Sequence, residues 1–114
     1  MKVDKRIIDD VTILSISSLE RLDASTSAQL RATLLESMGE SALKVVISLA
    51  GIRHIDSSGL SVFISLNKVL RKREGDLKLC TLTPTVRSMF ELTRLHRVFD
   101  LLADEEHAIA SFEG

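Results

Sequence analysis

Two adjacent serines, Ser57 and Ser58, lie between an aspartate and a glycine in the segment 55–60, which reads Ile-Asp-Ser-Ser-Gly-Leu. Either hydroxyl could accept a phosphoryl group from a kinase. Either could instead cap a helix, as could Asp56, by accepting an N–H of the first turn. Gly59 has no side chain and would let another backbone or a nucleotide approach closely. The segment therefore offers either a modification site or a helix cap.

A phosphate on Ser57 would add about 1.5 to 2 negative charges at the start of the helix expected to follow. The positive end of the helix dipole tolerates an anion, so the fold should survive the modification. Asp56 is adjacent, and Asp23 lies on the connection expected to be its neighbour. The added charge would therefore repel an acidic partner surface and could lower affinity about a hundredfold or more.

The elements that must position this segment follow from hydrophobic patterning. Two β-branched stretches, 3–8 and 11–17, are separated by two aspartates and predict a hairpin. The nearly continuous apolar run at 44–49 predicts a strand buried on both faces, which is typical of a parallel sheet. Further strands are predicted at 77–82 and 98–102.

Helices are predicted where apolar residues recur at intervals of three and four. The first runs from Asp23, with Asp23 or Ser25 as its N-cap, to Gly39. The second follows Asp56, ends in a basic turn and stops at Gly75. A third begins at Pro84, and the last spans 105–112.

This alternation predicts an α/β fold with a mixed, mostly parallel sheet of about five strands, an antiparallel edge hairpin and about four helices. We expect a single domain over residues 1–114. In such a sheet the strand-to-helix connections gather at the carboxyl edge of the strands, where helix N-termini expose unpaired N–H groups. Asp23 and the segment 55–60 should meet at this edge.

Composition excludes several classes of function. The chain has 114 residues, a formal net charge of −1, and neither tryptophan nor tyrosine, so nucleic acid is not an expected partner. Cys80 is the only cysteine and is expected to be a small buried apolar group. The start of the chain lacks the apolar core of a signal peptide, and no apolar run is long enough to span a bilayer. We expect a cytoplasmic protein without membrane insertion.

The histidines and glycines give no sign of a metal or cofactor. His54, His96 and His107 are far apart in sequence and lack the spacing of metal ligands. His54 precedes Asp56 by two residues and could touch a bound partner. No glycine-rich loop with a lysine is present, so any nucleotide should be bound by the partner and not by this chain.

The chain resembles the STAS domain, and within that family the bacterial anti-sigma factor antagonists. The resemblance rests on the segment 55–60 between a buried strand and an amphipathic helix, on Leu22-Asp23, and on the patterns at 89–92 and 95–99. It covers nearly the whole chain. It implies a regulator that switches partners when Ser57 is phosphorylated by a serine kinase that is also an anti-sigma factor. The dephosphorylated form captures that partner and frees the sigma factor, and a serine phosphatase resets the switch.

The resemblance also implies roles for individual residues. Ser57 would be the phosphoacceptor, Asp23 and Asp56 would flank it on the kinase-facing surface, and Ser58 and Gly59 would shape the start of the helix. Two departures from the family pattern stand out. Relatives often have Gly-Glu-Leu-Asp where residues 20–23 read Glu-Arg-Leu-Asp, and Arg94 replaces a glycine common in the late turn.

Three other functional hypotheses compete with that of a partner-switching antagonist. A serine hydrolase would need a Gly-x-Ser-x-Gly elbow and a separately placed base, and His54 and Asp56 are sequence neighbours of Ser57, so catalysis is not expected. A receiver domain phosphorylated on Asp56 would need an acidic cluster after the first strand, whereas Asp9-Asp10 falls in the hairpin turn. A STAS subunit or scaffold of a transporter, signalling or secretion-control complex would keep Ser57 only as a cap.

Overall fold

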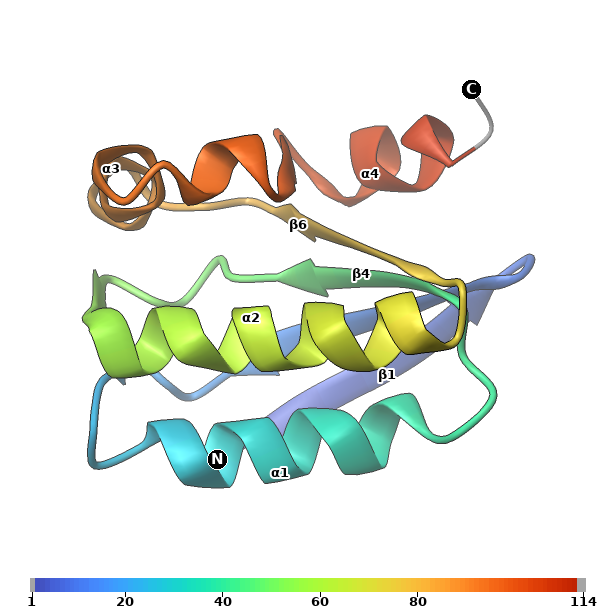
Figure 1. Ribbon diagram of the computed structural model, residues 1–114, viewed down its shortest axis with the longest axis horizontal. Helices are drawn as coiled ribbons and strands as arrows, with labels where there is room; N and C mark the ends of the chain where they lie inside the picture. The colour runs from blue at the N-terminus through green and yellow to red at the C-terminus, as the bar shows by residue number, and fades with distance from the viewer. Residues whose placement is uncertain (1, 113–114) are drawn as a thin grey trace.

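The computed structural model describes residues 2–112, whose main feature is a five-stranded sheet of order β1-β2-β4-β6-β7 (Figure 1). Its strands are β1 (Lys2–Ile8), β2 (Val11–Ser17), β4 (Lys44–Ser48), β6 (Asp76–Cys80) and β7 (Asp100–Leu102). β1 and β2 are antiparallel and joined by a tight turn, and every other pairing is parallel. The predicted mixed sheet with an edge hairpin is therefore confirmed.

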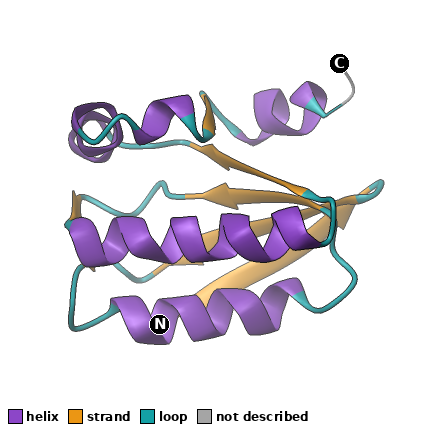
Figure 2. Cartoon of the chain, viewed as in Figure 1, coloured by secondary structure: helices purple, strands orange, loops and turns teal. Residues whose placement is uncertain are grey.

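Helices cover both faces of this sheet (Figures 1 and 2). They are α1 (Ser27–Met38), α2 (Ser57–Lys72), α3 (Pro84–Leu92) and α4 (Glu105–Ser111), with a 3₁₀ turn at Leu95–Arg97. α1 and α2 lie side by side over one face, and α4 packs against β4, β6 and β7 on the other. None of the helices in residues 2–112 is long and apolar enough to cross a membrane.

The alternation of side chains along the strands divides the interior into two parts. The larger core joins β2, β4 and β6 to the inner faces of α1 and α2, and it includes Leu14, Ile47, Leu34 and Phe63. A smaller cluster on the opposite face gathers Val11, Ile13, Val46, Cys80 and Ala108 under α4. Burial raises the pKa of the Cys80 thiol, which makes it a poor nucleophile at neutral pH.

Polar contacts also hold α4 against the second face. The ammonium group of Lys78 is almost buried, lies 3.2 Å from a carboxylate oxygen of Asp100, and stands 4.7 Å above the ring of Phe112. Glu105 pairs with Arg6 and accepts a hydrogen bond of 3.1 Å from the Ser15 hydroxyl. This buried lysine has no signal in the sequence, because strand periodicity only predicts that it faces the same side as Cys80.

The structure differs from the sequence predictions next to the candidate site. A separate two-stranded parallel sheet forms from β3 (Arg21–Leu22) and β5 (His54–Ile55), which are too short to show periodicity. The prediction that Asp23 or Ser25 is the N-cap of α1 was wrong, because the helix begins at Ser27 with Thr26 as its N-cap. Asp23 instead shapes the turn before the helix, where its carbonyl accepts hydrogen bonds from the backbone N–H groups of Thr26 and Ser27.

Candidate functional site

The small β3–β5 sheet brings the two connections together. Arg21 pairs with His54 and Leu22 with Ile55 across the two strands, and the N–H of Asp56 donates to the carbonyl of Leu22 at 3.2 Å. Because paired residues of parallel strands project to the same side, Arg21 and His54 stand next to each other, with Leu22 buried behind them. Asp23 and Asp56 directly follow these strands and line the same groove.

Asp56 is the N-cap of α2. Its backbone is extended, and its carboxylate accepts a hydrogen bond of 3.1 Å from the N–H of Gly59. Ser57 is therefore the first residue inside the helix, with an exposed side chain. Among residues 2–112 the Ser57 hydroxyl has no hydrogen-bond partner, although its carbonyl accepts one from the Ser61 hydroxyl at 2.9 Å. The helix is thus capped without any contribution from the Ser57 hydroxyl.

Ser58 occupies a different environment from its neighbour. It is half-buried and lines a groove of about 130 Å³ between α1 and α2, together with Ser61 and Arg31. Ser57 does not line this groove, and it does not line the larger one beside β3 and β5. The adjacent hydroxyls therefore face different surroundings, one in open solvent and one between two helices.

Gly59 is the point where α2 meets β3. A Cβ atom at this position would lie 2.7 Å from the carbonyl oxygen of Leu22 and 2.7 Å from Cγ1 of Ile55. Real Cβ contacts are longer than this, so only glycine fits without moving β3. The space left by the missing side chain is occupied by the carbonyl group of Leu22 and by the side chains of Leu22 and Ile55.

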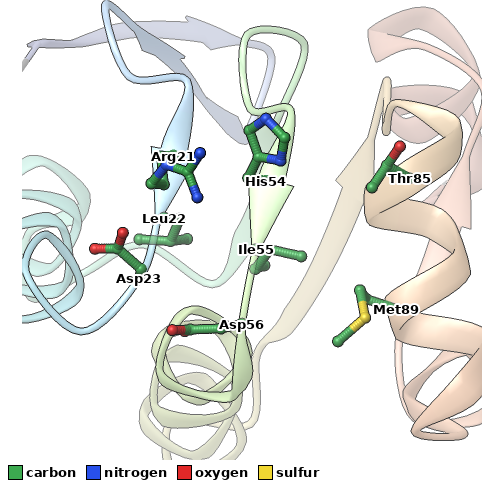
Figure 3. Close-up of a pocket in the computed structure, with 8 residues that line it drawn as sticks. All are labelled: Arg21, Leu22, Asp23, His54, Ile55, Asp56, Thr85 and Met89. Carbon is green, nitrogen blue, oxygen red and sulfur yellow. The ribbon is translucent and has the colours of Figure 1, made fainter.

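The larger groove has a volume of about 350 Å³ and separates the β3–β5 sheet from α3 (Figure 3). In Figure 3, Arg21 and His54 extend to one side of the strands, Asp56 lies at the start of α2, and two residues of α3 form the opposite wall. Its lining comprises Arg21, Leu22, Asp23, His54, Ile55, Asp56, Thr85 and Met89. The groove thus combines a cation, an imidazole, two carboxylates and an apolar floor.

Local hydrogen bonds hold the carboxylate of Asp23. It accepts bonds from the hydroxyl of Ser25 at 2.7 Å and from its backbone N–H at 2.9 Å. These bonds, with a smaller contribution from the charge of Arg21, lower the pKa of Asp23 below its usual value. Asp23 is therefore ionised at neutral pH and presents a negative charge on this surface.

Part of the groove could be predicted from the sequence and part could not. Asp23, His54 and Asp56 line it, and Ser57 adjoins it in the chain. Thr85 and Met89 were not singled out, because they come from a helix placed beside the site by the fold and carry no local signal. Arg21 was visible only as a departure from a family pattern.

The polar groups outside the groove were compared with the requirements of a metal site over the described part of the chain. Within residues 2–112 no three side chains of histidine, cysteine, aspartate or glutamate are close enough together to bind a metal ion. His107 instead hydrogen-bonds through Nδ1 to Asp104, the N-cap of α4, at 2.7 Å. His54 lies in the groove and is far in sequence from both Asp104 and His107.

Comparison with known proteins identifies the family. The STAS domain matches residues 2–108. BtrV of Bordetella bronchiseptica, provisionally named an anti-sigma factor antagonist, is 31% identical over 99% of this chain and 96% of its own. The anti-sigma-B factor antagonist of Bacillus subtilis is 25% identical over 96% of this chain and 99% of its own. An anti-sigma factor antagonist from Mycobacterium paratuberculosis has the same fold, with a TM-score of 0.85 and 22% identity over 99% of this chain and 94% of its own. The chain belongs to the STAS domain family.

Proposed function

We propose that this protein is an anti-sigma factor antagonist that switches partners in the cytoplasm. In its dephosphorylated form it binds a serine kinase that is also an anti-sigma factor, and so releases the target of that factor. Phosphorylation of Ser57 by the kinase, which supplies the ATP, ends the interaction, and a serine phosphatase restores it. The names of the two sequence relatives support the general role.

The observation that carries the proposal is that the Ser57 hydroxyl is exposed and makes no hydrogen bond with another of the described residues. If Ser57 served only as a helix cap, its hydroxyl oxygen would accept an N–H of the first turn, but the carboxylate of Asp56 has that role. Ser58 is less accessible, because it faces the groove between α1 and α2. A kinase approaching the start of α2 therefore meets the hydroxyl of Ser57 first.

The electrostatics of the surface support a phosphate as an off signal. Asp23 and Asp56 already place two carboxylates near the start of α2, and a phosphoserine would add about 1.5 to 2 further charges. The first-turn N–H groups of α2 stabilise an anion there, so the buried side of the helix, with Leu60 and Phe63, need not move. The modification would change the surface potential and leave the core as it is.

An immobilised bait series tests this proposal. Wild type, Ser57→Ala, Ser57→Asp and Ser41→Asp are exposed to lysate of the native cells, and the retained proteins are identified by mass spectrometry. Ser41 is exposed and lies just before β4, at the opposite edge of the sheet, so its variant controls for added charge alone. We expect a serine kinase on every bait except Ser57→Asp.

The purified kinase should then phosphorylate wild type and not Ser57→Ala. The phosphate should resist hydroxylamine, which would remove an acyl phosphate from Asp56. Retention of one partner by all four baits would contradict the switch and favour a constitutive scaffold.

A further inference from the structure

Arg21 and His54 form a polar pair on one rim of the larger groove (Figure 3). Both side chains are exposed, and the register of β3 and β5 places them directly opposite each other. Neither side chain has an ion pair or hydrogen bond with another residue in the described range 2–112. The guanidinium offers five N–H donors, and a neutral imidazole offers one in either tautomer.

The two carboxylates of the same groove, unlike Arg21 and His54, form hydrogen bonds within the chain. Asp56 accepts the N–H of Gly59 at the start of α2, and Asp23 accepts two bonds from Ser25. Arg21 acts on Asp23 only through its charge and does not form a direct ion pair with it. The donors on this rim are therefore free for an external acceptor, while the two acidic side chains have internal donors.

We propose that Arg21 and His54 together bind an acidic side chain of the partner, and that Arg21 selects which kinase this protein recognises. The inference rests on the proposed function and specifies its partner surface. A planar guanidinium binds a carboxylate through two parallel hydrogen bonds, and the neighbouring imidazole can donate a third. A kinase that presents lysine or arginine at this place would instead meet a like charge and be disfavoured.

The groove makes such a contact stronger than one on an open surface. The buried Leu22 and the half-buried Ile55 and Met89 provide apolar surroundings that exclude water once a partner covers them. A charge pair covered in this way couples more strongly than a solvent-exposed pair. We expect Arg21→Glu, which replaces attraction by repulsion, to weaken binding about a hundredfold or more.

The test uses the serine kinase that the Ser57→Ala bait retains, in purified form. Its dissociation constant is measured for wild type, Arg21→Ala, Arg21→Glu, His54→Ala and Lys68→Glu by surface plasmon resonance. Lys68 is exposed on α2, three turns from Ser57, and its variant makes the same change in net charge. Circular dichroism and urea unfolding verify that each variant is folded.

The expected result is a roughly hundredfold loss for Arg21→Glu and smaller losses for Arg21→Ala and His54→Ala. Lys68→Glu should bind within about threefold of wild type, since exposed distant charges are screened. A charge swap provides the second arm, in which acidic residues of the kinase are replaced one at a time by lysine. One of these replacements should restore binding to Arg21→Glu and weaken binding to wild type.

The possible failures are distinguishable. If the kinase binds Arg21→Glu as well as it binds Lys68→Glu, or if no replacement on the kinase restores binding, the acidic-contact proposal is wrong while the Ser57 switch stands. If no bait retains a serine kinase, the proposed function fails and the acidic-contact proposal fails with it. If the kinase binds Ser57→Asp as tightly as wild type, the proposed function fails, but the Arg21 variants still test the acidic-contact proposal.

Discussion

Replacing Gly59 by alanine tests how closely α2 must approach the strand that positions the site. The added Cβ would lie 2.7 Å from the backbone oxygen of Leu22, 2.7 Å from Cγ1 of Ile55 and 2.8 Å from Cγ of Leu22. The first of these neighbours belongs to the backbone and cannot rotate away. Relief therefore requires β3 to shift relative to α2, which would disturb the hydrogen bond from the N–H of Asp56 to Leu22.

Two opposing effects set the size of the change. Overpacking of this kind costs about 1 to 3 kcal/mol, and three close contacts place Gly59→Ala near the upper value. Alanine is better than glycine inside a helix by about 1 kcal/mol, which offsets part of that cost. We expect a net loss of about 2 kcal/mol in the free energy of unfolding, which would lower the urea midpoint by about 1 M.

Urea unfolding followed by circular dichroism measures this loss, with Gly51→Ala as the matched control. A Cβ at Gly51 would have its nearest neighbours at 3.7 and 3.8 Å, which are ordinary contacts. The free energy of unfolding of Gly51→Ala should therefore lie within about 0.5 kcal/mol of the wild-type value or be slightly higher. A midpoint for Gly59→Ala equal to or above that of wild type would refute the argument from close approach.

Three further predictions concern other parts of the chain. Arg94 has a left-handed backbone with φ 63°, so Arg94→Gly should raise the free energy of unfolding by about 0.5 to 1 kcal/mol in a urea titration, and a decrease would contradict this. The carboxylate of Asp104 accepts hydrogen bonds from the backbone N–H of His107 and from its ring Nδ1; both lower the pKa of Asp104, and the ring bond raises the pKa of His107. In Asp104→Asn the pKa of the His107 ring, followed by NMR titration, should therefore fall toward its ordinary value. The contribution of His107 to folding should be complete below its ordinary pKa and lost as the pH rises through the raised one, whereas that of Asp104 is lost as the pH falls through its lowered pKa. Asp100→Asn leaves the buried cation of Lys78 without its partner and should cost about 1 to 2 kcal/mol, while adding Lys78→Met should recover most of that loss; equal stabilities of the single and double variants would argue against the pair.

Long elements with a clear hydrophobic period could be predicted from the sequence. The run 44–49 indicated a central parallel strand, and the amphipathic pattern after Asp56 indicated α2. Both could be predicted because a buried face requires apolar residues at regular intervals along the sequence. The N-cap of α1 was placed too early, at Asp23 or Ser25 instead of Thr26. Asp23 and Ser25 have good capping side chains, but they bond to each other in the turn and leave Thr26 as the N-cap.

The candidate site was only partly predictable, for a physical reason. Asp56 and Ser57 could be found because the local motif determines the start of a helix. The groove depends on contacts between segments far apart in the chain, namely β3, β5 and α3, and two-residue strands are too short to have a period. The buried position of Lys78 likewise depends on α4 closing over the second face of the sheet, which no local pattern expresses.

The alternation of side chains in β3 and β5 has a consequence for how related proteins can change their binding surface. Each strand has one residue packed on the core and one exposed residue, so Leu22 and Ile55 hold the strands in place while Arg21 and His54 face solvent. The outward pair can change after gene duplication without disturbing the anchors or the helix that carries Ser57. Under the proposed function, copies of this protein in one cell could acquire different kinases by exchanging these two surface residues, so that one signal would not act on the target of another.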